Sequence, residues 1–221
     1  ARGEYAREPH AREGFGRAMC ADELIAEVRD NPKIIKYLDI PLQHSENRVL
    51  KLMGRRGTRE SYLKLIEKLR REIPGIALRS TFIAGFPTET EEEVEGLKAF
   101  LSEARFENCG FFAYSREEGT PAYQLKGQIH ARTKQRRVKA LYAVQEAIAD
   151  EYLVSYIGKT VRVVCDAVDF ERGCFVGRTY FQAYEADGVT YFTASQAVTG
   201  KVYDVIVERT EAGNLIGRAK E

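Results

Sequence analysis

The sequence predicts an α/β fold with parallel strands, followed by a small antiparallel β-barrel. Between residues 22 and 153, three short apolar runs alternate with longer segments that have helical periodicity. Connections of that length are typical of parallel strands joined by crossover helices. Beyond residue 158, short segments rich in Val, Tyr, Phe and Thr are separated by Gly or Asp-Gly turns, which is typical of a small barrel.

The first elements of the α/β part follow from local signals. Apolar residues at helical spacing begin behind Asp22 and end at Pro32, which predicts a short helix. The run KYLDIPLQH (36–44) predicts a buried strand. One or two helical turns follow over 47–53, and Thr58 is placed to cap an amphipathic helix that ends at Pro74.

A second strand, helix and strand complete the series. The run ALRSTFIAGFP (77–87) predicts a buried strand, and Thr90 with Glu93 has the spacing of a capping box at the start of the next helix. CGFFAYS (109–115) predicts the third strand. The long helix after the basic stretch 126–139 is expected to link two domains.

We expect three regions: a poorly ordered lead-in over 1–21, an α/β domain with its linking helix over 22–153, and a β-barrel over 154–221. The barrel strands are expected within 160–166, 174–183, 189–194, 201–208 and 214–219.

Composition excludes several classes of protein. The chain has 221 residues, 34 Lys and Arg against 33 Asp and Glu, and 44% hydrophobic residues. This balance argues against a polybasic nucleic-acid binder and against intrinsic disorder. Because we find neither a membrane-spanning run nor a secretory leader, we expect a cytoplasmic protein without a membrane partner.

The four cysteines are scattered. Cys20, Cys109, Cys165 and Cys174 form neither a CxxC nor a CxxxCxxC cluster. A disulfide framework is therefore not expected, and metal ligation by this chain alone is not expected either.

Polar groups follow each predicted strand. In a parallel β/α fold the site lies at the carboxyl ends of the strands, so Gln43 with His44, the segment 85–89 and the segment 115–117 should converge. The alternative is that these are ordinary loop starts. His44 is either a general base or ligand-orienting donor, or a hydrogen-bonded structural histidine.

Two further stretches have both a functional and a structural explanation. The glycine in IAGFPTET (83–90) suits either a close approach to a ligand at a helix N-terminus or a well-capped tight turn. In the barrel, Arg178, Tyr180, Phe181 and Tyr184 interleave charge with aromatic rings, as a base-stacking surface would, or the rings fill the barrel core.

Three long motifs carry a family resemblance. YLDIPLQHSENRVLKLMGRRGT (37–58), RSTFIAGFPTETEEEV (79–94) and YSREEGTPAYQL (114–125) resemble the radical S-adenosylmethionine methylthiotransferases, and GRTYFQAYEADGVTYF (177–192) resembles their TRAM domain. Within that family, PLQH, REEGTPA and RTYFQA resemble the RimO-type branch. The resemblance implies a partial TIM-type radical SAM barrel, with the three strands forming the second half of six, followed by an OB-like TRAM barrel.

The resemblance also implies cofactors and a reaction. Such enzymes use S-adenosylmethionine and [4Fe–4S] clusters to place a methylthio group, in the RimO-type branch on the β-carbon of an aspartate in a small-subunit ribosomal protein. The cluster motif CxxxCxxC is absent from this sequence, so the isolated chain is expected to be inactive. Two explanations remain open: the sequence is a fragment of a longer enzyme, or it is a degenerate enzyme.

Residues are carried over by position in the motifs, with no catalytic residue assigned. The cofactor-binding residues are expected to be Gln43, His44, Arg79, Thr81, Gly85 and Glu89, and the partner-binding residues Arg178, Tyr180 and Phe181.

Two other functions remain open from the residues. One is a tRNA methylthiotransferase of the MiaB type. The other is a module without enzyme activity, in which the TRAM-like barrel and the basic stretch bind RNA or the ribosome.

Overall fold

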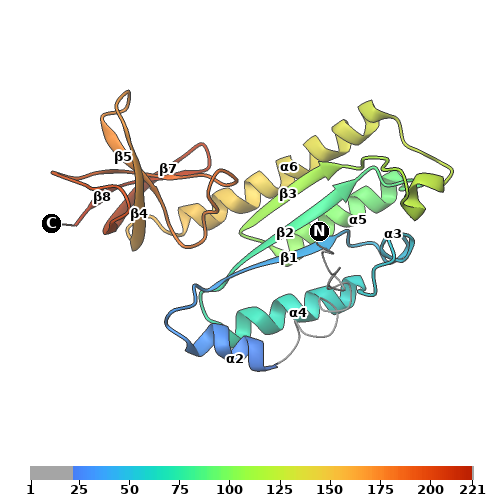
Figure 1. Cartoon of the computed structure of the whole chain (residues 1–221), viewed down its shortest axis with the longest axis horizontal. Helices are drawn as coiled ribbons and strands as arrows, with labels where there is room; N and C mark the ends of the chain where they lie inside the picture. The colour runs from blue at the N-terminus through green and yellow to red at the C-terminus, as the bar shows by residue number, and fades with distance from the viewer. Residues whose placement is uncertain (1–21, 221) are drawn as a thin grey trace, which may run out of the picture.

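The computed structural model describes residues 22–220, so the predicted lead-in over 1–21 lies outside the described residues. An α/β part comes first, and a long helix connects it to a β-barrel (Figure 1). The α/β part contains α2 (Asp22–Asp30), β1 (Tyr37–Gln43), α3 (Asn47–Leu52), α4 (Arg59–Glu72), β2 (Ala77–Ala84), α5 (Glu91–Ala104), β3 (Asn108–Ala113), the 3₁₀ helix η1 (Pro121–Gln124) and α6 (Ala131–Val154).

The three strands of the α/β part form one parallel sheet in the order β1-β2-β3. This confirms the predicted parallel series and matches half of a TIM-type barrel. Alternate side chains of β2 differ in burial, because successive residues of a strand point to opposite faces. Leu78, Phe82 and Ala84 join the core beside the helices, whereas Arg79 and Thr81 are partly exposed on the other face.

The core of the α/β part lies between the sheet and its helices. Phe82 is central to it, with ring centroids 6.2 Å from Phe100 of α5, 6.0 Å from Phe106 and 5.9 Å from Phe111 of β3. Buried aromatic side chains contribute large apolar areas, so this cluster fixes α5 against the sheet. The packing explains why the apolar residues of the predicted strands and helices have their periodicity.

Two predicted helix caps are confirmed. Thr58 accepts a hydrogen bond from the backbone N–H of Ser61, and the Ser61 hydroxyl accepts one from the Thr58 N–H. Thr90 and Glu93 form the same reciprocal arrangement at the start of α5. Each cap satisfies backbone N–H groups that the first turn of a helix leaves without partners.

The second part is a closed five-stranded barrel in the order β4-β5-β6-β8-β7. The pairing of β6 with β8 is parallel and the others are antiparallel, which modifies the expectation of a purely antiparallel barrel. Its strands are β4 (Thr160–Asp169), β5 (Cys174–Arg178), β6 (Thr190–Thr193), β7 (Val202–Glu211) and β8 (Asn214–Ala219).

The strand expected over 174–183 is shorter in the structure. It ends at Arg178, and the following residues form a loop that reaches the α/β part. The physical reason is tertiary: Phe181 packs against Tyr152 near the end of α6, so the chain leaves the barrel wall at this point. The domain boundary at 153/154 stays a prediction; α6 ends at Val154 and β4 begins at Thr160.

Candidate functional site

The segments that follow the three strands meet at the carboxyl edge of the sheet. His44 follows β1 directly, Gly85 follows β2, and Tyr114 follows β3. The backbone N–H of Tyr114 donates to the carbonyl of Ala84 (2.9 Å), which continues the pairing of the last two strands. The phenyl ring of Phe86 packs edge-on against Tyr114 with centroids 5.2 Å apart. The predicted convergence of the first two segments is also seen, because Nε2 of His44 lies 3.8 Å from Oε1 of Glu89.

His44 lies completely inside this edge. Its Nδ1 accepts a hydrogen bond from the backbone N–H of Glu46 (3.0 Å), and its Nε2 lies 3.8 Å from Oε1 of Glu89. Both of these facing atoms are buried and lack hydrogen-bond partners among the described residues. His44 is thus buried and faces Glu89.

Glu89 is the charged centre of the loop between β2 and α5. One of its carboxylate oxygens accepts a hydrogen bond from the Gly85 N–H, and Arg137 of α6 approaches the same oxygen to 3.5 Å. Arg137 also donates to the backbone carbonyl of Glu89 (3.1 Å) and to the carboxylate of Glu91 (2.7 Å). The hydrogen bond from Arg137 lowers the pKa of Glu91. Because Arg137 is itself buried, it provides the carboxylate of Glu89 with a buried countercharge.

Gly85 is needed at the end of β2 for two reasons. Its φ of +77° is in the left-handed region, and a Cβ placed there would lie 2.4 Å from Cγ of Lys134. Lys134 itself donates to the carbonyl of Tyr114 (2.8 Å), and burial lowers its pKa. The close approach predicted at IAGFPTET is thus made by a side chain of α6.

Thr81 lies on the face of the sheet opposite the helices, whereas Gln43 is the last residue of β1 and pairs in register with Phe82; both are partly exposed. Gln43 has a φ of +71°, in the left-handed region that non-glycine residues rarely adopt. Thr81 pairs in register with Gly110 of β3, beside the exposed Phe112. These residues form a surface with both polar and apolar groups toward the carboxyl edge.

Arg79 lies at the opposite, amino edge of the sheet. Its guanidinium pairs with Asp187, from the loop between β5 and β6, and approaches Asp39 of β1 to 3.8 Å. The structure therefore does not bring Arg79 together with His44, Gly85 and Glu89, because the barrel loop holds its side chain at the other end of the strands.

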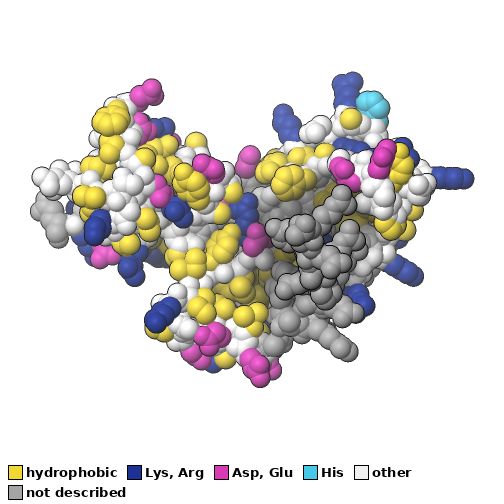
Figure 2. Space-filling model, viewed as in Figure 1, with side chains coloured by type: hydrophobic (Ala, Val, Ile, Leu, Met, Phe, Trp, Pro, Cys, Tyr) yellow, Lys and Arg dark blue, Asp and Glu magenta, His cyan; other side chains and the backbone are white. Residues whose placement is uncertain are grey.

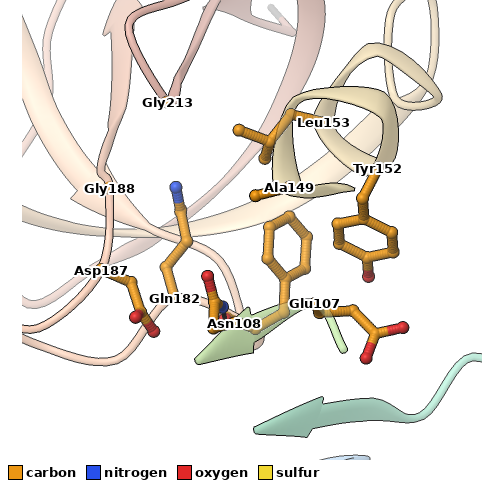
Figure 3. A pocket seen from close by; sticks show the side chains of 10 residues that line it. Glu107, Asn108, Ala149, Tyr152, Leu153, Gln182, Asp187, Gly188 and Gly213 are labelled. Atoms are coloured by element: carbon orange, nitrogen blue, oxygen red, sulfur yellow. Dashed lines mark hydrogen bonds between the residues drawn. The ribbon is translucent and has the colours of Figure 1, made fainter. Parts of the chain in front are cut away.

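The same barrel loop makes two more contacts with the amino edge. The Tyr180 hydroxyl donates to the carbonyl of Gly75 (2.8 Å), and the Asn108 side-chain amide donates to the carbonyl of Phe181 (2.9 Å). A small cavity of about 40 Å³ lies beneath this loop, and Asp187, Gln182, Asn108 and Glu107 are among the residues from the two parts of the molecule that line it (Figure 3). A cavity of that size can hold a water molecule.

Phe181 is 1% exposed and lies between Tyr152 and Tyr156 of the α6 end, with ring centroids at 5.3 and 4.9 Å. The ring fills the interface between the two parts, and its role in partner binding stays a prediction. Tyr180 keeps an exposed edge, whereas Arg178 forms an ion pair with Asp166 (3.0 Å).

A larger groove of about 680 Å³ opens beside this interface. It is lined by three cationic side chains, those of Lys36, Arg162 and Arg178; among residues 22–220, no carboxylate lines it. Tyr37 and Tyr180 lie among apolar lining residues of the same groove. On the face drawn in Figure 2, by contrast, acidic and basic side chains are interspersed.

Sequence reasoning missed Arg137, Lys134 and Asp187. The sequence did contain a signal for Arg137 and Lys134, because the basic stretch 126–139 could pair with the acidic residues at the start of α5. Charge alone, however, does not indicate which of these cations is buried. Asp187 belongs to an Asp-Gly turn, and nothing in that local pattern indicated its partner 108 positions away.

Within residues 22–220, no group of three or more His, Cys, Asp or Glu is arranged to hold a metal ion. In the same part of the chain, no helix has the length and apolar character to cross a bilayer.

Comparisons with known proteins agree with this architecture. The model of the Radical SAM superfamily matches residues 14–101, and that of the TRAM domain matches residues 157–219. A protein of Thermodesulfovibrio yellowstonii named ribosomal protein uS12 methylthiotransferase RimO is 47% identical over 192 residues, which cover 86% of this chain and 45% of that protein.

Two proteins with the same name extend the comparison. The one from Caldanaerobacter subterraneus is 49% identical over 170 residues (77% of this chain, 38% of that protein), and the one from Lachnoclostridium phytofermentans is 44% identical over 200 residues (90% and 46%). The chain belongs to the RimO-type radical SAM methylthiotransferases. It spans less than half the length of these RimO-type relatives.

Proposed function

We propose that this chain supplies one wall of the cofactor cavity, and the TRAM domain, of a methylthiotransferase that modifies the β-carbon of an aspartate in a small-subunit ribosomal protein. The observation that carries the proposal is the meeting of three strand exits at one edge of a parallel sheet in a chain of this family. In parallel β/α folds, active sites lie at that edge.

The residues fit the two cofactors of the family differently. Thr81 offers a polar group, and Ile83 with Phe112 offers apolar surface, on the face that a complete barrel would turn inward; Gln43 adds a polar group at the end of β1. This mixture suits the sugar, base and amino acid parts of S-adenosylmethionine. The residues described here do not offer ligands for an iron–sulfur cluster, so we derive no step through a cluster.

S-adenosylmethionine, when bound, would supply the abstraction of hydrogen from an unactivated carbon. In this proposal the chain's own residues bind and orient. Gln43 and Thr81 contact the cofactor, while Gly85 lets the backbone turn away beside Lys134. Arg79 is assigned to the interface between the two parts, since its partner is Asp187.

The substrate class follows from the relatives compared above, which are named for the ribosomal protein uS12. Those names favour a ribosomal protein over tRNA. A ribosomal substrate also agrees with the expected cytoplasmic location.

A chimera provides the test. The segment of the Thermodesulfovibrio yellowstonii protein that matches this chain would be replaced by the chain, and the anaerobically reconstituted product would be assayed by mass spectrometry for methylthio-aspartate in uS12. We expect activity, and we expect Gln43→Ala and Thr81→Val to raise the KM for S-adenosylmethionine. Phe170→Ala, a change at an exposed barrel residue, is the matched control. A chimera that carries its cluster but modifies tRNA, or neither substrate, would overturn the proposal.

A second candidate function is RNA binding by the groove of about 680 Å³. Its three cations and two tyrosines supply phosphate contacts and stacking surfaces, which are the two components of binding to single-stranded RNA. A titration of the chain with single-stranded RNA at several salt concentrations tests it. Arg162→Gln should weaken binding and make the salt dependence shallower by about one phosphate contact, whereas Arg172→Gln, outside the groove, should not. Absence of binding at low salt would exclude this function.

A further inference from the structure

The hydrogen-bond roles of the two ring nitrogens of His44 follow from their surroundings. Its Nδ1 accepts a hydrogen bond from the Glu46 N–H at 3.0 Å, so this nitrogen carries no hydrogen. In a neutral imidazole one nitrogen is a donor and the other an acceptor. The hydrogen of neutral His44 is therefore on Nε2, the atom that faces Glu89.

Nε2 of His44 and Oε1 of Glu89 are a buried donor and a buried acceptor that face each other without other partners. Their separation of 3.8 Å is too long for a hydrogen bond, yet a movement of less than about 1 Å would bring them within range. Buried polar groups are rarely left unpaired, because each loses its hydrogen bonds to water. The two atoms are thus natural partners for each other.

Glu89 in turn is paired with Arg137. The two side chains are almost fully buried, at 6% exposed for Arg137 and 0% for Glu89, and lie 3.5 Å apart. The second carboxylate oxygen is occupied by Arg137 and by the N–H of Gly85, which leaves Oε1 to face His44. The charge on the carboxylate is therefore compensated from α6, while one lone pair remains available for His44.

We propose that His44 is a positioning residue, which through Glu89 and Arg137 sets the spacing of the two loops that follow β1 and β2. The three residues come from the exit of β1, the loop before α5, and α6. His44 adjoins Gln43, whose backbone is in the left-handed region, and Glu89 holds the N–H of Gly85. This inference rests on the proposed function only in that Gln43 belongs to the cofactor wall. In this inference His44 and Glu89 do not contact the cofactor directly; they act through the buried triad of His44, Glu89 and Arg137.

His130 provides a matched control within the chain. Its Nδ1 also accepts a hydrogen bond from the backbone N–H two residues later, that of Arg132 (3.2 Å), but the side chain is exposed. The two histidines thus share one local motif and differ in burial and in the facing carboxylate. Any difference between their Nε2–H groups reports on Glu89 and its surroundings.

The experiment is ¹⁵N-resolved NMR of the histidine side chains in the full chain, with Glu89→Gln, Glu89→Ala and His130→Asn variants. We expect His44 to carry its hydrogen on Nε2 and to exchange it with water at least about tenfold more slowly than His130. Glu89→Gln should shift the Nε2–H resonance of His44 and keep its protection in part, since a carbonyl oxygen remains. Glu89→Ala should abolish the protection and speed amide exchange at Glu46, and His130→Asn should change neither.

Hydrogen on Nδ1 of His44, or exchange of its Nε2–H as fast as that of His130, would overturn the inference. If Glu89→Ala does not fold, the resonance shift in Glu89→Gln decides alone, and an unchanged resonance there contradicts the role of Glu89. Because these measurements need no cofactor, an inactive chimera with a protected Nε2–H would remove the proposed function and leave the positioning role of His44 in place.

Discussion

Arg79 of β2 and Asp187 of the barrel loop form an ion pair that joins the amino edge of the sheet to the barrel. Their side chains are only 14% and 6% exposed. Asp187 also accepts a hydrogen bond from the backbone N–H of Ala183, which orders its own loop. A surface charge pair contributes little, but removing one partner of a buried pair leaves an uncompensated charge.

Asp187→Asn should therefore destabilise the chain by about 3 kcal/mol, because it leaves Arg79 without its buried countercharge. Urea denaturation followed by circular dichroism measures the effect. Arg172→Gln, which breaks the exposed pair with Glu211, should cost less than about 1 kcal/mol. Equal small losses in the two variants would contradict the assignment of the buried pair as a connection between the two parts.

Phe181→Ala should cost about 4 kcal/mol, because it removes a fully buried ring from the aromatic cluster with Tyr152 and Tyr156. Phe170, which is 89% exposed, offers the comparison: Phe170→Ala should change the free energy of unfolding by less than about 0.5 kcal/mol. A stable Phe181→Ala protein with weakened RNA binding would contradict this structural role and favour a partner-binding role for the ring.

Gly85→Ala and Gly75→Ala separate backbone strain from a steric clash. Both glycines have positive φ, +77° and +79°, so each substitution should cost about 1 to 3 kcal/mol from strain. Only at Gly85 does the new Cβ also meet Lys134, so Gly85→Ala should be the more destabilising. Adding Lys134→Ala should recover that difference in a double-mutant cycle measured by thermal unfolding; simple additivity would show that Lys134 is not the obstacle.

Glu107 should give the stability of the chain an identifiable pH dependence. Burial raises the pKa of its carboxyl above the usual 4.5, although the Leu78 N–H donates to it at 2.7 Å. A raised folded-state pKa contributes stability that is fully present below about pH 4.5 and is lost as the pH rises through the folded-state pKa. Unfolding measured between pH 4 and 8 should contain this slope, and Glu107→Gln should remove it.

Glu91 provides the opposite sign. Its lowered pKa contributes stability above about pH 4.5 that is lost as the pH falls, so Glu91→Gln should lower the stability at neutral pH and flatten the acid side of the profile. For the preceding prediction, a Glu107→Gln profile identical to that of the unsubstituted chain would contradict the assignment of the slope between pH 4 and 8 to Glu107.

Local patterns predicted much of the fold. Strand β2, the caps at Thr58 and Thr90, and the series of parallel strands follow from apolar periodicity and from hydrogen bonds within a few residues. The convergence of His44, Gly85 and Glu89 followed from the rule that parallel strands share a carboxyl edge.

Other features depend on contacts between distant residues, which no local pattern contains. The residues around Phe181 have a strand-like composition, yet they leave the barrel. They do so because Phe181 packs against Tyr152 of α6 and its carbonyl accepts a hydrogen bond from Asn108 at the amino edge of the sheet. For the same reason Arg79 was expected beside the cofactor, although its partner lies in another domain. The inward orientation of Arg137 likewise depends on Glu89, 48 positions earlier.

Helix α6 begins beside the carboxyl edge, where Lys134 contacts Tyr114, and ends at the barrel (Figure 1). Its 24 residues correspond to a length of about 36 Å. If the chemistry takes place at the first end and the barrel recognises RNA at the second, one substrate must reach both. A fully extended peptide shorter than about ten residues is too short for that distance. We therefore expect an assembled ribosomal particle to be modified far more efficiently than a short peptide that contains the target aspartate.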